Sequence, residues 1–220
     1  MADKRGERLL RALRVYVITD SEHSLGRGTE EVVRCALAGG IGAIQLREKR
    51  LSDRRLLETA LSLRAMTRDA GALLIINDRV DIALAAGADG VHVGQDDLPA
   101  DAARRLLGAD RILGVTVETP AEAKAAEMAG ADYVGTGPVY STSTKPDAGQ
   151  PYGPVLVQRI KASTTLPVVA IGGIDQHNAE EVARAGADGL AVVSAVVGRQ
   201  DIEQSVRLLL EAFERGVSRV

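Results

Sequence analysis

Short apolar runs alternate with longer amphipathic stretches along the chain, and each apolar run gives way to polar residues. Eight runs are predicted as strands: Val15–Thr19, Ala43–Leu46, Leu73–Asn77, Gly90–Gly94, Ile112–Val117, Tyr133–Thr136, Val168–Ile171 and Gly189–Ser194. Such runs are typical of buried parallel strands, because helices cover both faces of a parallel sheet.

The stretches between the runs have helical patterns, as in Asp53–Ala70, Pro120–Ala129 and Asn178–Ala185. A Gly-Ala-Asp triplet recurs at 87–89, 108–110, 130–132 and 186–188, between a helical stretch and an apolar run. Glycine suits a helix end because it tolerates a positive φ. Eight such alternations predict an α/β fold, a single (β/α)8 TIM barrel over residues 1–220. An open doubly wound sheet is the alternative.

The composition narrows the function classes. The 220 residues include 27 basic and 30 acidic side chains, and only 2% are aromatic. Nucleic-acid binders usually have a basic patch or stacking aromatic residues, so this class is not expected. No run approaches the roughly 20 apolar residues of a membrane span, and Met1–Leu13 lacks the apolar stretch of a signal peptide. A single cysteine, Cys35, excludes a disulfide framework and is expected in the core. We expect a cytoplasmic protein without nucleic-acid or membrane partners.

Polar side chains collect where the predicted strands end, and barrel enzymes carry their chemistry there. Alternate residues of a strand share a face, so Gln45, Arg47 and Lys49 are expected to point into the barrel mouth. Buried cations are costly unless an anion meets them, which favours an anion site. The alternative is that Arg47 and Lys49 are solvated in a loop or pair with Glu48.

Asp78 and Asp97 follow two adjacent predicted strands and are expected to meet across the mouth. Neighbouring carboxylates repel, so they need a cation or a shared proton. Mg²⁺ typically binds one or two carboxylates together with water and substrate phosphate, so this pair is a candidate Mg²⁺ site. The alternative, compatible with the first, is that each Asp caps the helix that follows it, with Pro99 early in the second of these helices.

The longest irregular stretch, residues 137–153, is rich in hydroxyl groups and proline. Thr142, Ser143 and Thr144 offer hydroxyls, and Lys145 adds a mobile positive charge. Long loops in compact domains are usually lids or binding loops, so the stretch favours a lid that closes over phosphate. A merely flexible surface segment is the alternative.

A second candidate anion site lies later in the chain. Gly173 follows the seventh run, and Val193-Ser194 lies late in the eighth. Barrel enzymes often bind phosphate with backbone N–H groups after these two strands, and glycine permits the close approach. A tight turn without a ligand is the alternative. His92 is expected to be packed or hydrogen-bonded rather than a base, and no His- or Cys-rich spacing indicates zinc.

As a set, the motifs resemble the thiamine phosphate synthase family in order and spacing, from about residue 14 to 212. They are Tyr16-Val-Ile-Thr-Asp20, Gln45-Leu-Arg-Glu-Lys49, Ile76-Asn-Asp78, His92-Val-Gly-Gln-Asp-Asp97, Gly114-Val-Thr116, Gly135-Thr-Gly-Pro-Val with Thr142-Ser-Thr-Lys145, and Ile171-Gly-Gly-Ile174. The resemblance implies a transferase. It would join 4-amino-2-methyl-5-(diphosphooxymethyl)pyrimidine to a thiazole phosphate, giving thiamine phosphate and pyrophosphate.

The resemblance also implies residue roles. Arg47, Lys49, Lys145 and Thr116 would be catalytic, because in this family pyrophosphate leaves before the thiazole nitrogen attacks a pyrimidine carbocation. Asp78 and Asp97 would bind Mg²⁺. The substrates would be held by Gln45, Arg47, Lys49, Asn77, Thr116 and Lys145 for the pyrimidine pyrophosphate, and by Thr142, Ser143, Thr144, Gly173, Val193 and Ser194 for the thiazole phosphate.

Two residues depart from the family's pattern. Thr116 stands where a serine is usual, which keeps the hydroxyl but adds a methyl group. Glu118 stands where relatives often have the histidine that is important in the related thiazole tautomerases, so it speaks against a tautomerase. A tautomerase and a non-catalytic barrel that binds thiazole or thiamine phosphates are the alternatives. Small-molecule substrates are the expected partners, and a homo-oligomer is compatible with the sequence.

Overall fold

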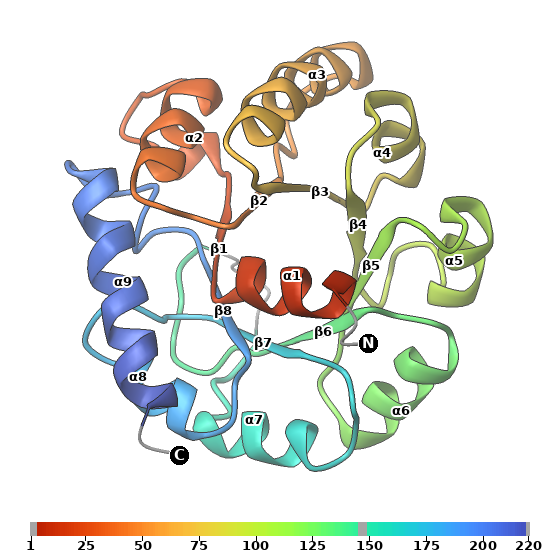
Figure 1. Ribbon diagram of the computed structural model, residues 1–220, viewed down its shortest axis with the longest axis vertical. Coiled ribbons are helices and arrows are strands. Elements are labelled where there is room, and N and C mark those ends of the chain that lie inside the picture. Colours follow the sequence, from red (N-terminus) through yellow and green to blue (C-terminus); the bar gives the residue numbers. More distant parts are fainter. Residues whose placement is uncertain (1–3, 145–148, 219–220) are drawn as a thin grey trace.

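Eight parallel strands form a closed barrel in the computed structural model, which describes residues 4–144 and 149–218 (Figure 1). Each strand pairs with its neighbours in chain order, and β8 closes the ring against β1. The strands are β1 (Val15–Ile18), β2 (Ala43–Leu46), β3 (Leu73–Asn77), β4 (Gly90–Val93), β5 (Ile112–Thr116), β6 (Tyr133–Thr136), β7 (Val168–Ile171) and β8 (Gly189–Val192). The predicted (β/α)8 barrel is confirmed, and the doubly wound alternative is wrong.

The helices form an outer ring around the strands, except for the first, which lies across one end of the barrel (Figure 1). They are α1 (Lys4–Leu13), α2 (Thr29–Ala38), α3 (Asp53–Asp69), α4 (Val80–Ala86), α5 (Ala100–Leu107), α6 (Pro120–Met128), α7 (Pro154–Lys161), α8 (Ala179–Arg184) and α9 (Ile202–Val217), with a short 3₁₀ turn, η1 (Ser21–His23). Over the described residues, no helix combines the length and the apolar character needed to cross a membrane.

Where the predicted element boundaries differ from the observed ones, they do so by one or two residues. The predicted eighth strand includes Val193 and Ser194, but β8 ends at Val192. The reason is local: the N–H groups of Val196 and Val197 both donate to the carbonyl of Val193, so the chain turns there. Asn178 precedes α8 as its N-cap instead of belonging to it.

Alternation along each strand separates two apolar clusters. Val15 and Val17 of β1 pack outward with the helices, whereas Tyr16 and Ile18 point into the barrel. The same alternation runs through the other strands, as expected for a two-residue repeat. The last inward position of each strand therefore forms a layer at the carboxyl end of the barrel.

Helix α1 closes the opposite end, and the sequence analysis did not predict it. Leu9, Ala12 and Leu13 are buried against the inward side chains at the lower end of the strands. The fit is close enough to require Gly42, because a Cβ there would lie 2.6 Å from the Cα of Ala12.

The Gly-Ala-Asp triplets join the helices to the strands. In three of the four copies the glycine has a positive φ, the alanine is buried and one carboxylate oxygen of the aspartate accepts a strand N–H at 2.8 Å. The same aspartates, Asp89, Asp132 and Asp188, each pair with a cation on the helix that precedes that strand, namely Arg64 of α3, Arg104 of α5 and Lys161 of α7. Three of the four triplets thus link a helix to a strand at the amino-terminal end of the barrel, which we call the lower rim.

Candidate active site

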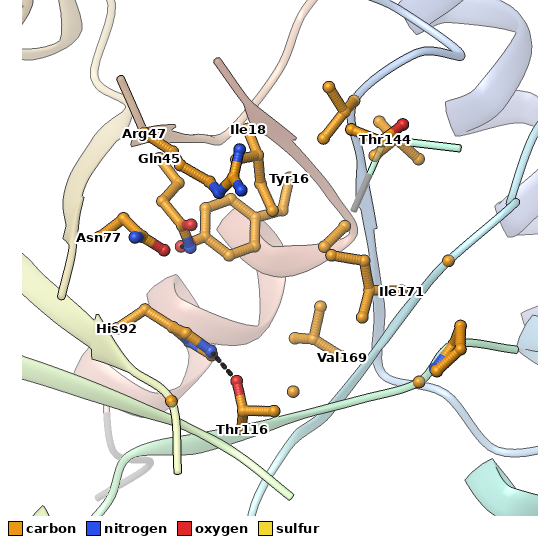
Figure 2. A pocket seen from close by; sticks show the side chains of 18 of the residues that line it. Tyr16, Ile18, Gln45, Arg47, Asn77, His92, Thr116, Thr144, Val169 and Ile171 are labelled. Atoms are coloured by element: carbon orange, nitrogen blue, oxygen red, sulfur yellow. Dashed lines mark hydrogen bonds between the residues drawn. The ribbon is translucent and has the colours of Figure 1, made fainter. Parts of the chain in front are cut away.

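A cavity of about 320 Å³ opens at the carboxyl ends of the strands (Figure 2). Its floor is the last inward layer of the barrel, which includes Gln45, Asn77, His92 and Thr116. Its walls come from the loops that follow the strands. The predicted gathering of polar groups at a single mouth is therefore observed.

Arg47 and Lys49 line the cavity on the side of β2. Arg47 is held in place, because its Nη1 lies 3.2 Å from a carboxylate oxygen of Asp20 and its backbone N–H donates to Thr19 Oγ1 at 3.0 Å. Lys49 is exposed at the rim and makes no ion pair with the described residues. The Glu48 carboxylate is buried and accepts hydrogen bonds from Ser21 and Thr29 instead, so its predicted alternative role as the partner of Arg47 is wrong.

Asp78 and Asp97 lie on the same side of the mouth, and Asp78 has a strained backbone. Its φ is +63°, and the N–H of Arg79 donates across it to the carbonyl of Asn77 at 2.7 Å. A positive φ outside glycine is uncommon, is most often tolerated by Asn and Asp, and tends to occur at functional sites. The tight turn directs the Asp78 side chain into the cavity, which it lines.

Burial, together with the hydrogen bond and negative charge of Asp97, raises the pKa of Asp78 to about 6, against the opposing charges of Lys49 and Arg47. Asp97 is oriented by the N–H of Gly94, which donates to its Oδ2 at 2.7 Å. Neither carboxylate caps a helix, because the N-cap residues of α4 and α5 are Arg79 and Pro99. The alternative prediction that both aspartates are caps is therefore wrong.

This pair of carboxylates has the character of a site for a hard cation. The described residues hold no cluster of three or more His, Cys, Asp or Glu side chains that could bind a metal ion. Zinc usually needs three or four such ligands, whereas Mg²⁺ often takes one or two carboxylates and leaves its other positions to water and phosphate. Asp78 and Asp97 thus fit Mg²⁺ in the presence of a phosphorylated ligand.

Tyr16 and Tyr133 fix the polar groups of the floor. The Gln45 amide donates to Tyr16 Oη at 2.6 Å, and the two phenol oxygens lie 3.0 Å apart. His92 joins Tyr133 to Thr116, with distances of 2.9 Å from Nδ1 to Tyr133 Oη and 2.9 Å from Nε2 to Thr116 Oγ1. Burial lowers the pKa of His92 to about 4, partly opposed by the charge of Asp97, so the imidazole is neutral at pH 7.

The opposite wall carries the second candidate anion site. Gly172 and Gly173 have φ values of +101° and +62°, which glycine adopts without strain. Any Cβ at Gly173 would also lie 2.5 Å from the carbonyl oxygen of Ser141, so the turn packs tightly on the loop after β6. Gly173, Val193 and Ser194 all line the cavity, and a helical turn begins at Val193.

The residues predicted to form a lid differ in where they lie. Thr142 and Thr144 line the cavity, and Thr142 Oγ1 accepts the N–H of Thr144 at 3.3 Å. Ser143 is exposed and does not line the cavity. Lys145 lies outside the described residues.

Several residues of the site were missed by sequence reasoning. Tyr16, Tyr133 and Gln95 line the cavity, and Asp20 braces Arg47. Gln95 Nε2 donates to the carbonyl of Thr116. The inward position of both tyrosines was a usable signal, since a phenol facing a barrel interior needs a polar partner.

The closed barrel, with cations and an acidic pair on one side of its mouth and a glycine-rich turn on the other, defines a (β/α)8 enzyme for anionic substrates. The chain matches the thiamine monophosphate synthase family over residues 15–196. It is 51% identical over 201 residues to the thiamine-phosphate synthase of Moorella thermoacetica, covering 91% of this chain and 96% of that protein. The corresponding protein of Chloroflexus aurantiacus is 52% identical over 196 residues, covering 89% and 90%.

A solved structure agrees with these sequence matches. The thiamine phosphate pyrophosphorylase from Pyrococcus furiosus aligns with a TM-score of 0.87 at 40% identity, covering 95% of this chain and 99% of that one. The chain belongs to the thiamine monophosphate synthase family. The predicted family and the predicted transferase of thiamine biosynthesis are confirmed.

Proposed function

We propose that the cavity joins an aminopyrimidine bearing a diphosphooxymethyl group to a thiazole phosphate, and releases pyrophosphate. The observation that carries this proposal is the pairing of two unlike anion sites in one mouth. Arg47, Lys49, Asp78 and Asp97 suit a highly charged diphosphate, whereas the neutral turn at Gly173 and Ser194 suits a phosphate monoester. The family match supports the same pair of substrates.

The departure of pyrophosphate is the step that the cationic side is arranged to assist. As the carbon–oxygen bond breaks, negative charge builds on the leaving oxygens and a cation forms on the pyrimidine methylene. Arg47, Lys49 and Lys145 neutralise the leaving charge, and the Thr116 hydroxyl donates a hydrogen bond to it. Preorganised donors of this kind lower the barrier because they need little rearrangement during the reaction.

Asp78 and Asp97 would hold Mg²⁺, which supplies charge neutralisation to the diphosphate when it is bound. Gln45, fixed by Tyr16, and Asn77 orient the pyrimidine ring at the floor. The thiazole phosphate binds against Gly173, Val193 and Ser194, with Thr142 and Thr144 beside the ring. This arrangement brings the thiazole nitrogen toward the methylene carbon, where it forms the new carbon–nitrogen bond.

A pyrophosphate-release assay tests this proposal. Release is expected only when both substrates and Mg²⁺ are present, together with formation of thiamine phosphate. A thiazole tautomerase would convert the thiazole without releasing pyrophosphate, and a binding protein would retain one ligand without turnover. Either result would refute the proposed reaction.

The variant Lys145→Ala tests the role of the lid. We expect it to fold normally and to lose about 10²–10³ in turnover, the usual effect of removing one preorganised donor. Circular dichroism and thermal unfolding check the fold. Turnover close to that of the wild type would remove Lys145 from the mechanism.

A further inference from the structure

A continuous chain of hydrogen bonds crosses the floor of the cavity. It joins side chains from five strands in the order Gln45, Tyr16, Tyr133, His92 and Thr116. Successive donor–acceptor distances are 2.6, 3.0, 2.9 and 2.9 Å. Figure 2 shows Gln45 and Tyr16 beside the cavity, and the bond from His92 to Thr116 as a dashed line.

The neighbouring backbone is shaped around this chain. A Cβ at Gly114 would lie 2.2 Å from Cζ of Tyr133 and 2.5 Å from Nδ1 of His92. A Cβ at Gly135 would lie 3.0 Å from Cε1 of His92. Both glycines have an ordinary negative φ, so their lack of a side chain, rather than their backbone freedom, is what the site requires. Two strands thus leave room for His92 and Tyr133 to pack together.

Counting the available protons indicates which group donates in each of these hydrogen bonds. The Gln45 amide donates to Tyr16, so the Tyr16 hydroxyl is free to donate to Tyr133. In the direction that gives every proton a partner, Tyr16 donates to Tyr133 and Tyr133 donates to Nδ1 of His92, because each phenol has only one proton to give. A neutral imidazole that accepts at Nδ1 carries its proton on Nε2, and this proton goes to Thr116 Oγ1.

Thr116 stands at the end of the chain, facing the cavity. Its oxygen already accepts the Nε2 proton of His92, so its own hydroxyl proton points to a ligand. With the direction reversed, Thr116 would donate to His92 and present only lone pairs to the cavity. A mouth that holds Arg47 and Lys49 for an anion is served by the first arrangement.

We propose that His92 is a positioning residue, which acts with Tyr133 to make Thr116 an obligatory hydrogen-bond donor to the departing diphosphate. This inference rests on the proposed function, since it takes the diphosphate to lie beside Thr116. His92 itself neither accepts a proton from the substrate nor touches the reacting atoms. Its contribution is to hold one proton at Nε2 and so to orient another on Thr116.

Two substitutions of His92 separate this role from simple packing. The shorter His92→Asn amide lies near the former Nδ1 and cannot reach Thr116, whereas the His92→Gln amide nitrogen can lie near the former Nε2. We expect His92→Asn to lose about 10- to 100-fold in kcat, the usual effect of removing an outer partner of a site, with little change in either KM. His92→Gln should recover most of that loss. Equal losses in both variants, or a wild-type kcat in His92→Asn, would overturn the inference.

A double-mutant cycle tests whether the effect passes through Thr116. The double variant His92→Asn/Thr116→Val should be no slower than Thr116→Val alone, because both changes remove the same hydrogen bond to the diphosphate. Losses that multiply would overturn the proposal. Thr67→Val is the matched control, since the buried Thr67 hydroxyl donates to the carbonyl of Arg64 on α3 and does not line the cavity, and kcat should stay unchanged.

The tautomer of His92 can be measured without any catalytic variant. In ¹⁵N-histidine spectra, where the three histidines are assigned with His92→Gln, the wild type should show a neutral His92 with its proton on Nε2. A proton on Nδ1 would overturn the proposal. If Thr116→Val has wild-type kcat while the wild type releases pyrophosphate, this inference fails and the proposed function stands. If the wild type releases none, both fail.

Discussion

The two ends of the barrel use aspartate in opposite ways. At the lower rim, Asp89, Asp132 and Asp188 each accept a backbone N–H and pair with an Arg or Lys at 2.6–2.9 Å. At the mouth, Asp78 and Asp97 lie against each other, and neither makes an ion pair within the described residues. The same side chain therefore stabilises the fold at one end and is left electrostatically unsatisfied at the other.

The difference shows how a barrel can separate stability from chemistry. At the lower rim, each carboxylate has a fixed cation that neutralises its charge. The acidic pair at the mouth has no paired cation among the described residues, so it keeps its negative charge available, at the expense of repulsion that a bound cation would relieve. Changes at the mouth should therefore alter the rate more than stability, and changes at the lower rim should do the reverse.

The largest expected effect is on the rate, at Lys49. Lys49→Ala should lower kcat by about 10²–10³, because it removes a cation that stabilises the leaving group. The free energy of unfolding should change by less than about 0.5 kcal/mol, as for most exposed positions. Arg50→Ala is the matched control, since Arg50 is exposed, pairs with Glu22 and does not line the cavity. Equal losses in both variants would show that only general surface charge matters.

A smaller effect, on stability alone, is expected at Asp188. Asp188→Ala leaves the buried N–H of Val168 without its acceptor and Lys161 without its partner. The free energy of unfolding should fall by about 1–3 kcal/mol, with kcat unchanged at a temperature where the variant is folded. Asp110→Ala is the control, because Asp110 accepts no strand N–H within the described residues. Denaturant titration measures both; a loss of kcat in folded Asp188→Ala would contradict the separation of the two ends.

The smallest effect is a pH dependence at Asp78 in the metal-free protein. Its pKa is about 6 in the folded state and about 3.9 when unfolded. The folded state therefore keeps this proton longer, and the contribution of Asp78 to stability falls as pH rises from about 4 to about 6. Asp78→Asn removes this dependence and should be more stable than the wild type by about 1 kcal/mol at pH 7, allowing for solvent screening.

Added Mg²⁺ sharpens this last prediction. It should stabilise the wild type at pH 7, lose that effect below about pH 6 as Asp78 takes up its proton, and leave Asp78→Asn nearly unchanged. Thermal unfolding at several pH values, with and without Mg²⁺, measures these terms. Identical pH profiles for the two proteins would show that Asp78 is not perturbed by its neighbour.

Much of the fold was predictable because the short apolar runs and the helix patterns are local. The strand ends at Leu46, Asn77, Thr136 and Ile171 match the predicted ones. Helix α1 escaped prediction because its apolar face is short and has meaning only against the open end of a barrel. The predicted position of the mouth followed from the strand ends alone.

The candidate site was predictable where sequence neighbours act together, as in Gln45, Arg47 and Lys49. It was not predictable where distant residues meet. The contacts of Tyr16 with Tyr133, and of Asp20 with Arg47, depend on register around the closed ring. Whether Asp78 was a cap or a cavity residue depended on one backbone angle, which composition does not reveal.

Because α1 closes one end of the barrel, it limits how ligands can enter and leave the cavity. With Leu9, Ala12 and Leu13 sealing the far end, the described chamber has one entrance. Under the proposed reaction, both substrates therefore enter, and both products leave, through the mouth at the carboxyl ends of the strands.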